Sequence, residues 1–394
     1  MKQKIKIEAV IGANYGDEGK GLLTDFICKN NPDSLVVMTN GGSQRGHTVE
    51  HEDGKKHIFH HFGSGTFRNK ITYFPQSYLL NPMQFVKEYN ELCNIGYKPF
   101  AFRHPDCILQ LPSDIAMNWH LEKSRGEKKH GSVGCGIWET KYRIMNNKAC
   151  TLEWFCSRPY ADKVEYIKQI ADWQRSHRCD EENVNKYIDL YDLFLSDGFI
   201  DHFIADCDFM YNRCLKIYLN TLIKNFNIST VVFENGQGLK LDQFYNAHDI
   251  HNTTPSFTGS IEIAKIINDD ILFSDIENIN LNYVSRTYLT KHGAGNFAEE
   301  KLRENKFKFD DETNGTNEWQ DDLRFAELDY DALFKRCDID TNKFKEFMFS
   351  NQCKINQKIA MTHANEVEID KKYLDKISLI SDTKYTFNEN DVYF

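Results

Sequence analysis

Short apolar runs, rich in β-branched and aromatic residues, recur along the chain between polar turns. They predict strands at Ile5–Ile11, Leu35–Thr39, Ile71–Phe74, Phe100–Phe102, Ile108–Leu111, Thr230–Phe233, Tyr283–Tyr288, Lys358–Thr362 and Ile377–Ser381. Between several of these runs the apolar positions follow helical spacing, as in Pro82–Cys93 and Thr258–Ile267. Strands that alternate with helices predict an α/β fold, with a large mixed, mostly parallel central sheet flanked by helices.

Residues 151–228 form the longest stretch without a strand pattern, and they are rich in Tyr, Asp, Leu and Lys. This composition predicts a helical subdomain that packs beside the sheet. The chain contains no internal repeat, no low-complexity tract and no Pro/Ser-rich linker. We therefore expect residues 1–394 to form a single domain that includes this subdomain.

The first apolar run leads directly into a glycine-rich loop, Gly12-Ala-Asn-Tyr-Gly16-Asp17-Glu18-Gly19-Lys20-Gly21. Glycines allow backbone N–H groups to converge on an anion and a lysine adds positive charge, so the loop is typical of a phosphate site. It is not a standard P-loop, because Gly21 follows Lys20 where Ser or Thr is usual. The carboxylates of Asp17 and Glu18 would repel a phosphate unless they bind a metal or transfer a proton. The loop therefore indicates catalysis as well as binding.

Three further loops with glycines and polar residues follow predicted strands, at Asn40–Thr48, Glu234–Gly238 and Lys291–Phe297. Each loop alone could be an ordinary turn in which glycine supplies a positive φ. In parallel sheets, however, ligands bind in the crevice outside the carboxyl ends of the strands. Four such loops therefore predict one shared ligand site.

Composition and charge indicate which kinds of molecule this protein binds. The formal net charge of −10 argues against a nucleic-acid-binding protein, which would need a basic face. The eleven cysteines include no C-x-x-C pair and no zinc-type spacing. The N-terminal residues lack an apolar signal region, and no apolar window is long enough to span a bilayer. We therefore expect a cytoplasmic protein with reduced thiols and with neither nucleic acid nor membrane as a partner.

The loops resemble those of adenylosuccinate synthetases. The phosphate loop of that family reads W-G-D-E-G-K-G, and Tyr15–Gly21 differs from it only in the aromatic residue. The second family loop reads G-G-x-N-A-G-H-T, and Gly41–Thr48 matches five of its eight positions. The family motifs H-x-x-P-S-G, G-T-T-G-R-G-I, F-E-G-A-Q-G and G-A-G-P-F follow in the same order as His60–Gly65, Gly131–Ile137, Phe233–Gly238 and Gly293–Phe297. The resemblance covers about residues 5–365.

This resemblance implies a homodimeric ligase that joins L-aspartate to the six-position of inosine monophosphate (IMP), using GTP and Mg²⁺. It implies that Asp17 is the base that takes the purine N1 proton, and that His47 is an acid that stabilises the transferring oxygens. Lys20 would neutralise charge on the phosphate. Magnesium would be bound by Asp17 and by the backbone carbonyl of Gly46, since oxygen ligands suit this cation.

Further binding residues are implied by the same motifs. The triphosphate would contact Gly16, Glu18, Gly19, Lys20, Gly21, Gly46, Thr48 and Asn365. The purine monophosphate would contact Asp17, Gln44, Ser132, Val133, Arg143, Gln237 and Thr254, with Arg143 at a position near the family arginine that reaches the partner subunit's nucleotide.

Two departures from the family pattern concern substrate recognition. The arginine-rich loop T-T-G-R-x-R-R, which binds the aspartate carboxylates, corresponds to Thr316–Phe325, where only Arg324 remains as a carboxylate clamp. The T-K-x-D motif, whose aspartate reads guanine, ends here in Asn365, and an amide does not offer a carboxylate's two acceptors. Guanine selectivity should therefore weaken, and ATP or dATP becomes a candidate donor.

Two other functions stay open. The divergent viral relatives make 2-aminoadenylosuccinate from dGMP with an adenine nucleotide as donor, although they often lack the loop aspartate that this chain keeps as Asp17. A nucleotide-binding sensor or subunit that has lost ligation would explain the missing arginines. The sequence leaves open the purine monophosphate, the amine, the triphosphate, the oligomeric state and the biological setting.

Overall fold

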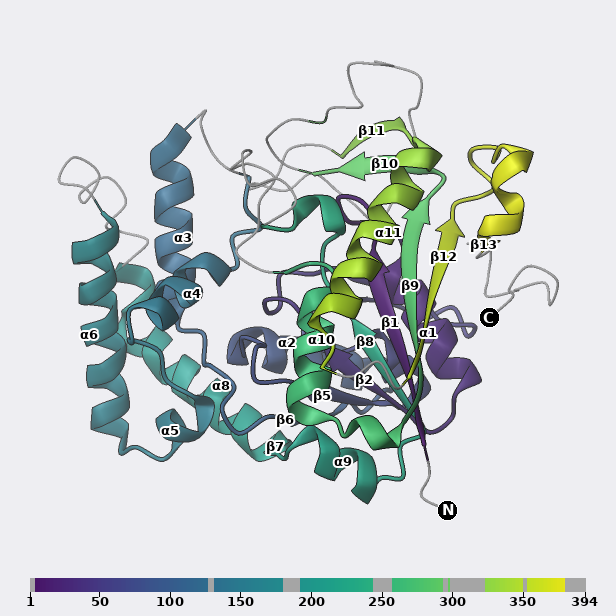
Figure 1. The fold of residues 1–394 in the computed structure, drawn as a ribbon. Coiled ribbons are helices and arrows are strands. Elements are labelled where there is room, and N and C mark those ends of the chain that lie inside the picture. The colour runs from purple at the N-terminus through teal and green to yellow at the C-terminus, as the bar shows by residue number, and fades with distance from the viewer. Residues whose placement is uncertain are drawn as a thin grey trace.

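A nine-stranded sheet forms the centre of the protein (Figure 1). The structure is a computed structural model, and it describes residues 4–126, 131–179, 192–243, 257–292, 297, 323–349 and 353–379. The strand order is β13-β12-β9-β1-β8-β2-β5-β6-β7, and every neighbouring pair is parallel. The strands are β1 (Ile5–Gly12), β2 (Ser34–Met38), β5 (Ile71–Phe74), β6 (Phe100–Arg103), β7 (Cys214–Lys216), β8 (Thr230–Glu234), β9 (Ile276–Arg286), β12 (Lys354–Thr362) and β13 (Ser378–Leu379).

Antiparallel pairing occurs outside this sheet. One two-stranded ribbon joins β3 (His47–Glu50) to β4 (Lys56–Phe59), and another joins β10 (Tyr288–Lys291) to β11 (Arg324–Glu327). The predicted α/β fold with a large central sheet is confirmed. Within the described ranges, however, the central sheet is parallel throughout and not mixed, because the antiparallel strands form separate ribbons.

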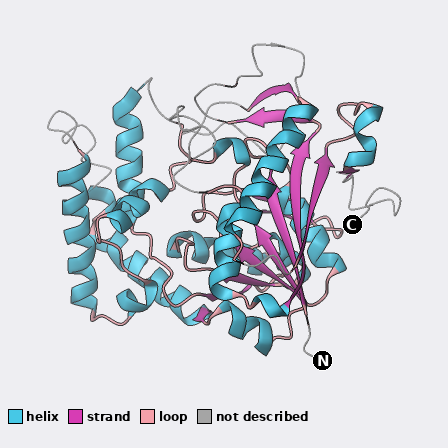
Figure 2. Ribbon diagram, in the orientation of Figure 1, coloured by secondary structure: helices cyan, strands magenta, loops and turns pink. Residues whose placement is uncertain are grey.

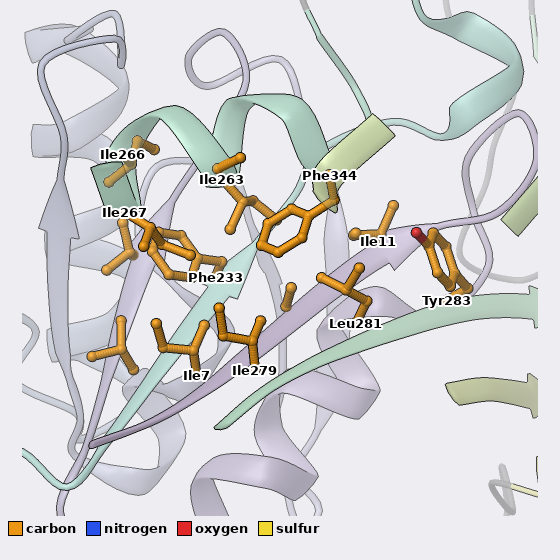
Figure 3. Packing of buried hydrophobic residues seen from close by; sticks show 14 of the residues in the cluster. Ile7, Ile11, Phe233, Ile263, Ile266, Ile267, Ile279, Leu281, Tyr283 and Phe344 are labelled. Carbon is orange, nitrogen blue, oxygen red and sulfur yellow. The ribbon is translucent and has the colours of Figure 1, made fainter. Parts of the chain in front are cut away.

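Helices cover both faces of the sheet (Figure 2). The alternation of side chains in β1 explains this arrangement, since successive residues of a strand point to opposite faces. Ile7 and Ile11 pack with residues of β9 and of the helices that cover one face (Figure 3), whereas Val10 packs with residues of the helices on the other face. The first face is covered by α9 (Leu219–Asn225), α10 (Ser260–Asp270) and α11 (Tyr330–Phe347), and the second by α1 (Lys20–Asn30), α2 (Pro82–Asn94) and α8 (Asp197–Arg213).

A group of helices lies beside the sheet, on the left of Figure 1. It contains α5 (Leu152–Cys156), α6 (Tyr160–Arg178) and α8, together with α3 (Pro112–Arg125) and α4 (Ile137–Met145) from earlier in the chain. Residues of α5, α6 and α8 share one hydrophobic cluster with the sheet. The predicted strand-free region is therefore largely helical where it is described, but it also supplies the three-residue edge strand β7. Its status as a subdomain of one domain stays a prediction.

One predicted strand is wrong. Ile108–Leu111 forms only isolated bridges, from Leu109 to Leu80 and from Ile108 to Thr151, because α3 begins with Pro112 directly after it. The eleven cysteines all lie in described ranges and are all free thiols. Among the described residues, no helix is long and apolar enough to cross a bilayer.

Candidate active site

A cavity of about 1870 Å³ opens where the central strands end. It is lined by the loop after β1, by the loop after β2, by the β3–β4 ribbon and by the start of α2. Gln237, from the loop after β8, and His292, which follows β10, also line it. All four predicted loops thus contribute to one cavity, the fourth through His292, and the loops after β1, β2 and β8 meet there as expected for the carboxyl ends of parallel strands. Residues 293–296 of the fourth loop lie outside the described residues.

The loop after β1 leads into the N-terminus of α1. Gly19 caps this helix with a φ of +93°, a left-handed conformation that suits glycine. Asp17 also has a positive φ, of +59°, which is uncommon for a residue with a side chain. Gly16, Gly19, Lys20 and Gly21 all line the cavity. The backbone N–H groups at the start of a helix favour phosphate binding, so this loop is suited to the predicted triphosphate contacts.

Glu18 organises the loop internally. Its carboxylate accepts hydrogen bonds from the backbone N–H groups of Asn14, at 2.8 Å, and Gly16, at 2.9 Å. It also forms a buried ion pair with Nζ of Lys20 at 2.8 Å. The carboxylate of Glu18 therefore has its partners within the loop, and it holds Lys20 at the cavity wall. A direct contact of Glu18 with the triphosphate stays a prediction.

Side chains from distant elements fix the loop backbone. Arg336 of α11 donates from Nε to one loop carbonyl at 2.9 Å. Thr290 of β10 donates to a second loop carbonyl at 3.0 Å, and Thr362, at the end of β12, donates to a third at 2.9 Å. These three contacts satisfy buried carbonyl groups and hold the loop before any ligand binds.

Asp17 is the loop carboxylate that remains accessible. Its side chain is 24% exposed, and Oδ2 lies 3.6 Å from Nε2 of His292. Gly46 lines the same cavity from the loop after β2. Among the described residues, no three His, Cys, Asp or Glu side chains gather as a metal site. One carboxylate and one carbonyl fit Mg²⁺ nevertheless, because this cation is often bound by one or two carboxylates, waters and substrate phosphates.

His47 is the first residue of β3, and it is bound to a buried carboxylate. Its Nδ1 lies 2.6 Å from Oε1 of Glu234, at the end of β8. Ser64 donates to both oxygens of Glu234, from Oγ at 2.5 Å and from its backbone N–H at 2.9 Å. Burial raises the pKa of Glu234, but the hydrogen bonds from His47 and Ser64 outweigh it and hold that pKa below its usual range. Burial lowers the pKa of His47 despite the bond to Glu234.

This arrangement defines the protonation of His47. A carboxylate accepts hydrogen bonds only, so Nδ1 of the neutral ring carries the proton and Nε2 is left as the second polar atom. The ring is therefore held in one tautomer and one orientation, as a positioned acid–base group needs.

The loops after β2 and β8 are joined by a reciprocal pair of hydrogen bonds. Oδ1 of Asn40 accepts from the backbone N–H of Gly236 at 2.7 Å, and Nδ2 of Asn40 donates to the carbonyl of Gly236 at 2.9 Å. Nδ2 of Asn235 donates to two further carbonyls at 3.0 Å each. His47 and Gln237 are thereby kept at fixed positions relative to each other.

The residues predicted to bind the purine monophosphate differ in their placement. Gln237 and Val133 line the cavity, and Oε1 of Gln237 is buried without a hydrogen-bond partner. Gln44 lines it too, but its amide folds back onto its own loop, accepting from the N–H of Gly42 at 2.6 Å. Ser132 exchanges hydrogen bonds with Asn118 and lies behind the cavity lining. Thr254 lies outside the described residues.

Arg143 is a predicted nucleotide ligand whose side chain has its partners elsewhere. Its guanidinium forms a bidentate ion pair with Asp114, with both N–O distances at 2.7 Å, and neither side chain is exposed. Nη2 also donates to the carbonyl of Leu109 at 2.8 Å. The residue is engaged inside the helical group and does not line the cavity. These contacts do not favour nucleotide binding, and the predicted contact of Arg143 with the partner subunit's nucleotide stays a prediction.

The two residues expected to recognise the base and the amine lie beside the cavity lining. Asn365 is exposed in the turn that follows β12, where His363 is the residue that reaches the cavity. Arg324 begins β11, and its guanidinium lies over the ring of Phe297 at 5.6 Å. Thr48, which is also predicted to contact the triphosphate, lines the cavity.

Several residues that shape the site escaped the sequence prediction. Glu234 and Ser64 lie inside two of the quoted motifs, and a carboxylate at the end of a wholly apolar strand was an available signal. Arg45 and His292 line the cavity, and their place inside two of the predicted loops was the available signal.

Known proteins resemble this chain in sequence. A model of the adenylosuccinate synthetase family matches residues 9–365. The adenylosuccinate synthetase of Haemophilus ducreyi is 29% identical over 308 residues, which cover 76% of this chain and 66% of the relative. The adenylosuccinate synthetase of Acinetobacter baylyi is 28% identical over 309 residues, which cover 74% and 63%. The chain thus spans about two thirds of the length of these curated relatives.

Solved structures resemble it in fold. The fully ligated adenylosuccinate synthetase from Plasmodium falciparum matches with a TM-score of 0.64 and 18% identity, over 92% of this chain and 77% of that one. The succinoaminodeoxyadenylate synthetase of cyanophage S-2L, bound to dGMP and dATP as an energy donor, matches with a TM-score of 0.53 and 14% identity, over 92% and 85%. At such identities the likeness shows the shared fold.

Proposed function

The chain belongs to the adenylosuccinate synthetase family, and from this premise we propose that it is a purine-nucleotide ligase that uses a nucleoside triphosphate. The observation that carries the proposal is one cavity lined by Asp17, Lys20 and His47, the residues matched to the family's catalytic positions. A protein that only binds nucleotides does not require a partly exposed carboxylate and an oriented imidazole in the same cavity. The family precedent also suggests a cytoplasmic homodimer.

The residues support a two-step reaction. Asp17 removes the N1 proton of a 6-oxopurine monophosphate, and the 6-oxygen then attacks the γ-phosphorus of the triphosphate, which leaves as the diphosphate. Lys20 stabilises charge on the transferring oxygens, and His47 does so in its doubly protonated form, in which Nε2 donates while Glu234 holds Nδ1. The amine then adds to C6, and phosphate leaves with the former 6-oxygen. Mg²⁺, held by Asp17 and the carbonyl of Gly46, would neutralise phosphate charge when bound.

We propose IMP and L-aspartate as substrates, giving adenylosuccinate, with Arg324 as the remaining carboxylate clamp. A second candidate is 2-aminoadenylosuccinate synthesis from dGMP with ATP or dATP. The observation that favours it is Asn365, an exposed amide at the position where the family pattern has the guanine-reading aspartate. The retained Asp17 favours the first candidate.

A turnover screen tests both candidates. The purified protein is assayed for phosphate release and for the coupled nucleotide, with IMP, GMP or dGMP as acceptor, L-aspartate as amine, and GTP, ATP or dATP as donor, each with Mg²⁺. We expect turnover with IMP. Turnover with dGMP alone would establish the second candidate, and tight nucleotide binding without turnover in any combination would favour a sensor or subunit.

The role of Asp17 has its own test. Asp17→Ala should abolish phosphate release and leave the fold intact, because the side chain faces the cavity and not the core. Asp197→Ala serves as the control, since Asp197 is 88% exposed on α8 and should tolerate the change. An active Asp17→Ala protein would disprove the mechanism.

A further inference from the structure

Arg45 is a buried cation at the wall of the cavity. Its side chain is 3% exposed, and it stands in the second loop at the position where the family motif has alanine. Nη1 donates to the backbone carbonyl of Glu234 at 2.8 Å, and Nη2 donates to that of Thr39. Both acceptors are neutral groups, and the carboxylate of Glu234 is already occupied by other donors. Within the described part of the chain its partners are these two carbonyls and the ring of Tyr78, whose centre lies 5.5 Å away, and a buried guanidinium without a charged partner is costly.

The guanidinium has donors to spare. It carries five N–H groups, of which these two bonds use two, and Nε is buried without a hydrogen-bond partner among the described residues. A methyl group added to Gly236 would lie 3.6 Å from Nε, and the next residue, Gln237, has the buried oxygen without a partner. Among the described residues, a donor and an acceptor that both lack partners thus belong to two side chains that line the same cavity.

We propose that Arg45 binds the O6/N7 edge of the purine monophosphate and makes the site selective for 6-oxopurines. A purine with a 6-oxo group offers two adjacent acceptors there, which a guanidinium fork matches, whereas a 6-aminopurine offers a donor at position six. The inference rests on the proposed function, because it takes this end of the cavity as the purine site. The positive charge of Arg45 also stabilises the negative charge that forms on O6 during the reaction.

Binding measurements without turnover test this role. Calorimetry compares IMP, GMP and AMP on wild type, Arg45→Ala and Arg45→Lys, in the presence of Mg²⁺ and without triphosphate. In Arg45→Ala the affinity for IMP and GMP should fall between about five-fold and a hundred-fold, whereas that for AMP should stay unchanged. Lysine keeps the charge but loses the fork, so Arg45→Lys should reduce the IMP preference several-fold.

A purely structural role would give another result. If Arg45 only clamps the strand ends, its loss weakens IMP and AMP alike, and the ratio of their affinities does not move. Arg103→Ala is the matched control. Arg103 is also buried, but its guanidinium lies 3.1 Å from the carboxylate of Glu153, and neither residue lines the cavity. It should lower thermal stability and leave the affinity ratio unchanged. If Arg45→Ala does not fold, an unchanged ratio in Arg45→Lys overturns the proposal.

The outcome is separable from that of the proposed function. Wild type that prefers IMP over AMP but turns over no substrate would refute the ligase and leave the role of Arg45 standing. Turnover of IMP together with an unchanged affinity ratio in both variants would refute the role of Arg45 alone. Wild type that binds none of the 6-oxopurine monophosphates would overturn this inference.

Discussion

Replacing Arg143 by methionine should destabilise the protein and leave purine monophosphate binding unchanged. Methionine roughly preserves the length of the side chain, but it removes the bidentate ion pair with Asp114 and the bond to the carbonyl of Leu109. The motif comparison places Arg143 at a nucleotide, whereas the structure places it in the interior of the helical group. The two readings predict opposite results.

The expected size of the effect follows from the contacts of Asp114. Removing one partner of a buried ion pair costs about 3–5 kcal/mol, because the other charge is left without compensation. Asp114 would still accept from Gln174 at 2.7 Å, Thr140 at 2.9 Å and the N–H of Leu111 at 2.9 Å. The loss should therefore lie near the lower end, at about 3 kcal/mol. That is a large part of the roughly 5–15 kcal/mol that stabilises a typical domain.

Urea unfolding followed by tryptophan fluorescence measures the stability, and calorimetry measures IMP binding. Lys168→Met is the control, since Lys168 pairs with Asp197 at 3.1 Å and the two side chains are 48% and 88% exposed, so its loss should cost about 1 kcal/mol or less. If Arg143→Met unfolds at the wild-type urea concentration but no longer binds IMP, the residue is a nucleotide ligand and the structural reasoning is wrong.

Other changes have equally defined outcomes. Glu234→Gln should lower kcat about 10–100-fold, because His47 loses the carboxylate that fixes its orientation; steady-state kinetics with a wild-type kcat would contradict this. Burial, helped by the charge of Arg45, lowers the pKa of His61 from about 6.5 to about 3. The unfolded chain therefore binds a proton at this residue before the folded protein does. The free energy of unfolding should be unaffected by His61 above about pH 6.5 and should fall by about 1.4 kcal/mol per pH unit between pH 6.5 and pH 3. His61→Gln, which keeps an acceptor but does not titrate, should therefore lose less stability than wild type between pH 7 and pH 5 in urea unfolding, and equal losses would refute the assignment. Asn365→Asp should raise the preference for GTP over ATP in a KM comparison, and an unchanged ratio would show that Asn365 does not contact the base. Chelation with EDTA should abolish turnover, and added Mg²⁺ should restore it; activity that persists in EDTA would count against a metal requirement.

The sequence predicts the location of the site because the apolar runs predict parallel strands and the ends of parallel strands predict where a ligand binds. Short runs rich in β-branched residues, such as Ile5–Ile11 and Thr230–Phe233, favour buried parallel strands. The strands of a parallel sheet end at one edge, so the glycine-rich segments that follow them must meet. The segments after β1, β2 and β8 do meet, since each contributes residues to the lining of one cavity. The positions of Asp17, Lys20 and His47 in the cavity then follow from the positions of the strands.

The partners of individual side chains follow from no such rule. Arg143 meets Asp114 across 29 residues and His47 meets Glu234 across 187, and tertiary packing alone decides both contacts. The strand β7 has only three residues, which is too short for a periodic pattern. Motif position therefore predicts which backbone segment reaches the cavity, but it does not predict whether a given side chain turns toward the cavity or into the core.

Burial explains where this chain departs from its family. Asn365, a departure from the family motif, is exposed in the turn after β12, so its replacement costs little folding energy. Glu234 is fully buried and bound by two residues, so a change there would leave polar groups without partners. Asn235, which stands at a motif glycine, is buried as well, but its amide donates to two carbonyls at 3.0 Å. Arg45 stands at the motif alanine, and its buried charge carries a desolvation cost that two carbonyls and the ring of Tyr78 offset only in part. A substitution that the fold does not favour, at the wall of the reaction cavity, is best explained by a substrate that completes its hydrogen bonds.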